Sequence, residues 1–148
     1  MKNQVQFKHF GTMIDCSRNA VMNVKTLKKW IDLTADLGYN TLCLYMEDTY
    51  EVADEPYFGY LRGRYSKEEL KEIDEYAKKR GMEVIPCIQT LAHLNQMFRW
   101  PKYLPTMIRT IFYSSTTKTF IPLLTGVFKR WRSVFPRKQS ISAWTKPL

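Results

Sequence analysis

The sequence predicts an α/β fold in which parallel strands alternate with helices. Residues 9–88 read in the order strand, helix, strand, helix, strand. The strand segments are short and almost wholly apolar, as strands of a parallel sheet are when helices cover them. At 148 residues the chain has room for one ordinary domain. A complete eight-stranded (β/α) barrel needs roughly 200 residues or more.

The first strand is expected from His9 to Ile14, ending at Asp15, and buried because it is apolar. A helix N-cap is expected within residues 23–26, and Gly38 ends the helix that follows. The apolar residues of this helix recur at helical spacing: Leu27, Trp30, Ile31, Leu33 and Leu37.

The second strand is expected over Thr41–Met46, followed by a polar, aromatic loop. Ser66–Glu69 has the pattern of a capping box that opens a second helix. Positive charge in its last turn and glycine at Gly81 end that helix. One face of this helix is apolar: Leu70, Ile73, Tyr76 and Ala77. The third strand is expected over Val84–Ile88.

Polar residues follow each strand, at the edge of the sheet where parallel α/β folds collect their chemistry. They are Asp15 and Arg18 after the first strand, Glu47 and Asp48 after the second, and His93 after the third. A guanidinium there could hold sugar hydroxyls or a carboxylate. Adjacent carboxylates can perform acid–base chemistry because each raises the pKa of the other.

Each of these candidates also has a structural interpretation. Asp15 and Arg18 could form a salt bridge that ties a loop. The two carboxylates after the second strand could be a solvated or capping pair, and only one would face a pocket because successive strand residues point to opposite faces. The histidine could be structural. Trp100 and Tyr103 could stack on sugar rings, although neither is specific.

The formal charge of +9 comes entirely from the last third of the chain. Residues 1–100 hold 14 basic and 14 acidic residues, whereas residues 101–148 hold nine Lys and Arg and no acid. The three cysteines, Cys16, Cys43 and Cys87, suggest neither a disulfide framework nor a metal site, and we expect reduced thiols in a cytoplasmic protein. We expect no signal peptide, membrane span, cofactor or metal.

Several features in order carry a resemblance to a known family. They are Gly11, Asp15 and Ser17-Arg18, then Leu37–Asn40, Glu47-Asp48, Tyr65–Leu70, Arg80–Pro86 and His93. Over Phe7 to Tyr103 the sequence resembles glycoside hydrolase family 20, the β-N-acetylhexosaminidases. It most resembles the intracellular bacterial branch, through the segments DCSRNAV, LYMEDTY, YFGYLRG and PCIQTLAHL.

The resemblance implies a partial (β/α)8 TIM barrel, with two βα units and a third strand. It also implies that Arg18 binds hydroxyls of a terminal N-acetylhexosamine, that His93 lies near the catalytic acid, and that Asp15, Glu47 and Asp48 support the site. In the family the 2-acetamido oxygen of the substrate attacks the anomeric carbon. An Asp-Glu pair after the fourth strand orients this group and supplies the acid.

The family's catalytic Asp-Glu pair is absent after the third strand, so no catalytic residue is assigned. The genetic code allows a test for a shifted reading frame, in which each triplet starts at the last base of the preceding codon. In that frame, codons compatible with residues 139–147 can encode Thr-Ile-Asn-Ile-Gly-Met-Asp-Glu-Ala. Within it, Trp144 (TGG) before Thr145 (ACN) forces GAC, an Asp. We therefore expect a glycosidase portion over residues 1–103. Residues 104–148 would be an out-of-frame tail with little defined structure and no packed face.

We predict that the chain is a fragment of an exo-acting β-N-acetylhexosaminidase and is itself inactive. The substrates of the intact family would be N-acetylhexosamine-containing glycans. We expect no specific nucleic-acid or membrane partner. The alternative is a small α/β binding protein whose basic tail contacts nucleic acid or anionic membrane. Aromatic residues interleaved in the tail suit that alternative: Phe120, Phe128, Trp131 and Phe135.

Overall fold

The computed structural model describes residues 7–18, 20–90, 93–109, 112–113 and 120–135. Within these ranges a parallel sheet of three strands has the order β1-β2-β3. The strands are β1 (Gly11–Asp15), β2 (Thr41–Met46) and β3 (Glu83–Ile88). In register, Met13 lies beside Cys43 and Cys43 beside Ile85. The predicted order and parallel pairing are confirmed.

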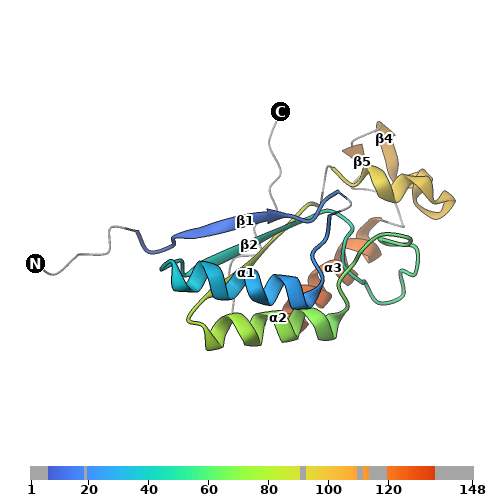
Figure 1. Ribbon diagram of the computed structural model, residues 1–148. Helices are drawn as coiled ribbons and strands as arrows, with labels where there is room; N and C mark the ends of the chain where they lie inside the picture. Colours follow the sequence, from blue (N-terminus) through green and yellow to red (C-terminus); the bar gives the residue numbers. More distant parts are fainter. Residues whose placement is uncertain (1–6, 19, 91–92, 110–111, 114–119, 136–148) are drawn as a thin grey trace, which may run out of the picture.

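Two helices lie side by side on one face of the sheet (Figure 1), α1 (Val24–Asp36) and α2 (Lys67–Lys79). The Asn23 side chain caps α1 by accepting a hydrogen bond from the Thr26 amide at 2.8 Å. Both hydrogen bonds of the predicted capping box, between Ser66 and Glu69, are present at the start of α2. These local signals set where the helices begin because they satisfy amides that have no intrahelical partner.

The predicted apolar face of α1 is only partly buried. Leu27 and Ile31 are fully buried, but Leu33 is 54% exposed and Leu37 is 64% exposed. Thr34 is buried instead, with its hydroxyl bonded to the Trp30 carbonyl at 2.8 Å. Leu33 and Leu37 lie on a flank that is exposed in the described part of the chain.

The first strand differs from the expectation of a buried strand. Its pairing with β2 uses one edge, and Ile14 alone of its residues is buried. Met13 is 61% exposed, and it points to the opposite face of the strand from its buried neighbour Ile14. Apolar composition predicted burial, but a strand of an open parallel sheet is buried only where another layer covers it.

Short elements follow the sheet: the 3-10 helices η1 (Asn95–Arg99) and η2 (Pro101–Thr106), and an antiparallel pair, β4 (Met107–Arg109) and β5 (Phe112–Tyr113). Helix α3 (Phe120–Val134) then packs beside α2. The apolar face of α3 is buried: Leu123, Val127, Trp131 and Val134, followed by Phe135. The expectation that residues 104–148 have little structure and no packed face is therefore wrong for residues 120–135. Apolar spacing in this segment suffices for a helix with a buried face.

Candidate functional site

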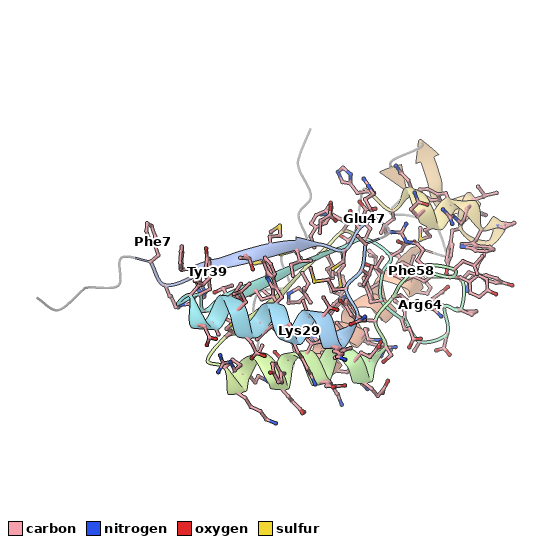
Figure 2. All side chains as sticks on the ribbon, in the orientation of Figure 1. Phe7, Lys29, Tyr39, Glu47, Phe58 and Arg64 are labelled. Carbon is pink, nitrogen blue, oxygen red and sulfur yellow. The ribbon has the colours of Figure 1, made fainter. Side chains whose placement is uncertain are left out.

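Arg18 and Glu47 meet at the carboxyl end of the parallel sheet. Arg18 Nη1 lies 3.0 Å from Glu47 Oε2, and this contact joins the residues that follow β1 and β2. The Arg18 side chain is 68% exposed, whereas that of Glu47 is only 2% exposed. Figure 2 shows Glu47 at the opposite end of the sheet from Tyr39. A buried carboxylate thus holds a guanidinium that presents its remaining donors to solvent.

The Glu47 carboxyl has a strongly shifted pKa. The pKa of Glu47 is raised to about 7, chiefly by burial; the Arg18 and Arg62 guanidinium groups lower it, and the nearby Asp48 charge contributes to the rise. Near neutral pH this carboxyl therefore exists in both protonation states. It can accept a hydrogen bond when ionised and donate one when protonated.

Asp48 takes a different partner from its neighbour. The Asp48 side chain is 2% exposed, and its Oδ1 lies 3.2 Å from Arg62 Nε. The two atoms are close enough for an ion pair but are not aligned as a hydrogen bond. Burial raises the pKa of Asp48, and the Arg62 guanidinium lowers it. The interpretation of Glu47 and Asp48 as a solvated pair is wrong, since both carboxylates are buried and each faces its own arginine.

Asp15 stabilises the turn that leads to Arg18. The Ser17 amide donates a hydrogen bond to Asp15 Oδ1 at 2.7 Å. Hydrogen bonds from Ser17, first of all from its side chain, hold the pKa of Asp15 below its ordinary value. The alternative of an Asp15–Arg18 salt bridge is replaced by the observed Arg18–Glu47 contact.

His93 follows β3, so it belongs to the same end of the sheet as the other candidates. It is exposed, and its φ of 63° lies in the left-handed region. A residue other than glycine adopts this conformation at some energetic cost and often at a functional site. The role of His93, like those of Asp15, Arg18, Glu47 and Asp48, stays a prediction.

Aromatic side chains border this end of the sheet. Trp100 packs against Tyr57 and Tyr60, with ring centroids 5.3 Å away in each case. Tyr103 is fully buried and donates a hydrogen bond to Glu55 at 2.8 Å. The expectation that Tyr103 could stack on a sugar is therefore wrong, because its ring faces are covered by protein.

Two Asp-Glu dipeptides do occur in the chain, but neither is a candidate for the family's catalytic pair. Asp54 and Glu55 lie in the loop after β2, where Glu55 accepts hydrogen bonds from Lys102 and Tyr103. The other pair, residues 74–75, lies inside α2, where the first of its carboxylates forms an ion pair with Lys78 at 2.5 Å.

Sequence reasoning did not identify Arg62 as a site residue. Its side chain is 4% exposed and contacts residues that follow β1 and β2. No sequence signal separated it from other arginines of a polar loop. No cluster of three or more His, Cys, Asp or Glu side chains that could hold a metal occurs among the described residues. Within the same ranges, every helix is too short or too polar to cross a membrane.

Parallel βα units with paired charges at the carboxyl ends of the strands are the arrangement expected in part of a (β/α) barrel. The chain belongs to glycosyl hydrolase family 20, because the model of that family's catalytic domain matches residues 7–135. The match extends beyond Tyr103 and includes α3.

Named relatives agree with this assignment. The chain is 29% identical to a β-hexosaminidase of Akkermansia muciniphila over 88% of its length, and 30% identical to β-hexosaminidase subunit beta of Mus musculus over 88%. It covers 31% and 27% of these relatives, so it spans less than a third of their length. A β-N-acetylhexosaminidase structure from Bacteroides fragilis shares the fold, with a TM-score of 0.74, 24% identity and coverage of 88% of this chain and 30% of that one.

Proposed function

We propose that this chain is a fragment of an exo-acting β-N-acetylhexosaminidase and binds a terminal N-acetylhexosamine at the carboxyl end of its sheet. The observation that carries the proposal is the Arg18–Glu47 pair, in which a buried carboxylate directs a mostly exposed guanidinium outward. The donors of a guanidinium fork suit the hydroxyls of a sugar. Glu47, only 2% exposed, contributes by holding the Arg18 guanidinium in place.

The intact enzyme would use substrate-assisted catalysis, in which the 2-acetamido oxygen attacks the anomeric carbon and the leaving group takes a proton from an acid. Arg18 would hold the sugar ring, while Glu47, Asp48, Asp15 and His93 would support this end of the site. Residues 101–148 hold no carboxylate side chain for the acid or for orienting the acetamido group. We therefore expect the 148-residue chain to bind the sugar without hydrolysing it.

Two measurements on the full chain test this function. A chromogenic N-acetyl-β-glucosaminide should show no turnover above background, because the main rate-enhancing groups are missing. N-acetylglucosamine should shift NMR resonances at the carboxyl ends of β1 and β2, and Arg18→Ala should abolish that shift without unfolding a chain in which this side chain is 68% exposed. Turnover that Arg18→Ala removes would refute inactivity, and binding unchanged by Arg18→Ala would refute the site.

We also propose that a change of reading frame near Pro101–Thr106 precedes the basic tail. The complete absence of acids in residues 101–148 and the permitted Gly-Met-Asp-Glu-Ala in the shifted frame support this origin. Adding or removing one base in these codons of the gene should open a long frame that continues into the rest of a barrel. Immediate stop codons in that frame would rule the proposal out.

The alternative of a nucleic-acid or membrane-binding tail loses part of its support. Trp131 is fully buried and Phe135 is 4% exposed, so these rings are not available to stack on bases. The positive charge of the tail should still attract polyanions weakly, nonspecifically and with steep dependence on salt. Salt-resistant, sequence-selective binding would favour the alternative.

We further propose a cytoplasmic location, which three cysteine thiols support.

A further inference from the structure

Arg62 connects the residues after β1 to the residues after β2. Its guanidinium donates hydrogen bonds to the Ser17 carbonyl and, at 3.0 Å, to the Arg18 carbonyl. The same group lies 3.2 Å from the Asp48 carboxylate. With 4% of its side chain exposed, Arg62 lies beneath the site and leaves contact with solvent to Arg18.

The loop that carries Arg62 is closely fitted to the end of β2. Gly59 adopts a φ of 66°, and a Cβ there would lie 2.0 Å from the Asp48 carbonyl oxygen, which is too close for any side chain. Tyr50 and Tyr65 form a parallel bridge that closes the base of the loop. The Tyr65 hydroxyl donates at 2.5 Å to the Met22 carbonyl, which precedes α1. The loop is thus tied to both segments that Arg62 joins.

Arg62 also separates the charges of the site. Asp48 lies next to Glu47 in sequence, and each of their carboxylates is stabilised in its charged form by the positive charge of Arg18. The ion pair with Arg62 partly neutralises Asp48. The guanidinium of Arg18 is then left to pair with Glu47 at 3.0 Å rather than with Asp48.

We propose that Arg62 is a positioning residue: it fixes the main chain of Arg18 and occupies Asp48, so that the Arg18–Glu47 pair is held ready for the sugar. This inference rests on the proposed function for the role of Arg18. A planar guanidinium can hold two carbonyls and a carboxylate together, whereas an ammonium supplies charge without the fixed fork.

The test compares Arg62→Gln and Arg62→Lys with Arg64→Gln in the full chain. Arg64 is the matched control because it belongs to the same loop but contacts Glu51, at 3.9 Å, and the Pro56 and Phe58 carbonyls. Two quantities are measured by NMR: the titration midpoint of the Glu47 carboxyl and the dissociation constant of N-acetylglucosamine. Circular dichroism establishes that each variant is folded.

Arg62→Gln should raise the Glu47 midpoint, because the Arg62 charge lowers the pKa of Glu47, and should weaken sugar binding about tenfold. Arg62→Lys should keep the midpoint near that of the parent chain yet still weaken binding, because the fork is lost. Arg64→Gln should change neither quantity.

Parent-like sugar binding in folded Arg62→Gln or Arg62→Lys would overturn the inference, as would an equal loss of binding in Arg64→Gln. If Arg62→Gln does not fold, Arg62→Lys decides, since it keeps a positive charge beside Asp48. Absence of sugar binding by the parent chain would instead refute the proposed function. In that case a Glu47 midpoint unchanged by Arg62→Gln would refute the arrangement of charges as well.

Discussion

Helices α2 and α3 both bury an apolar face, but different interactions hold them. Helix α2 begins at the Ser66 capping box and is joined to α1 by polar contacts. Glu72 accepts from Lys28 at 2.6 Å, and the Tyr76 hydroxyl donates to Asp32 at 2.8 Å. Arg80, which ends α2, pairs with Asp32 at 3.0 Å. Each of these contacts requires a charged or polar side chain on α1 opposite a complementary one on α2 or at its end.

Helix α3 is held through apolar packing. Trp131 is fully buried and meets the ring of Tyr50 edge-on, with centroids 4.9 Å apart. It also stacks on Phe135 at 5.6 Å. The segment from Phe120 to Val134 has no acidic residue, so it can form no internal ion pair of the kind that joins Asp74 to Lys78 in α2.

The difference shows how little sequence information apolar packing requires. Hydrophobic burial is nondirectional, so residues that are apolar and of suitable size can form a buried face without evolved partners. Ion pairs and caps require specific chemistry at matched positions. A packed α3 is therefore compatible with the proposed change of reading frame, and among the described residues no ion pair joins α3 to the rest of the chain.

The largest effect should come from the apolar face of α3. Trp131→Ala removes a fully buried side chain and should lower the free energy of unfolding by about 3–5 kcal/mol. Phe128→Ala, at a position 38% exposed on the same helix, should cost much less. Urea denaturation followed by circular dichroism measures both. If both variants have the same free energy of unfolding as the parent chain, α3 does not contribute to the folded core.

A smaller loss should follow from breaking the cap of α2. Ser66→Ala removes the acceptor for the Glu69 amide and should lower the free energy of unfolding by about 1 kcal/mol. Ser133→Ala in α3 is the matched control, because that hydroxyl is exposed and bonds only the Arg130 carbonyl at 2.7 Å among the contacts described. Equal effects of the two substitutions would remove the distinction between a capped helix and one held by packing.

The smallest effect should come from the polar contacts between α1 and α2. Asp32→Asn should destabilise the chain less than Ser66→Ala, and the loss should shrink in 1 M salt, as it does for exposed ion pairs. The hydrogen bond to Asp32 is the main reason that the pKa of Tyr76 is raised, so the variant should lower that pKa toward the ordinary tyrosine value. Ultraviolet titration measures this change. Arg132→Gln in α3 is the control and should alter neither quantity.

Part of the site could be predicted from the sequence and part could not. The polar residues after each strand were identifiable because parallel strands end at a common edge. The ion-pair partner of Arg18 could not be predicted, because the carboxylates of Asp15, Glu47 and Asp48 were all expected at the same edge of the sheet. Arg62 escaped prediction because a loop arginine that turns inward has the same local sequence as one that turns outward.

The sequence by itself determined the order of strands and helices from β1 to β3, the cap at Ser66 and the glycine stop at Gly81. These features depend on hydrogen bonds and periodicity within a few residues. Tertiary structure alone decided that Arg18 pairs with Glu47, 29 residues away, that Met13 is exposed, and that α3 packs against the body. Such outcomes depend on which distant segments come together, and local sequence does not encode that.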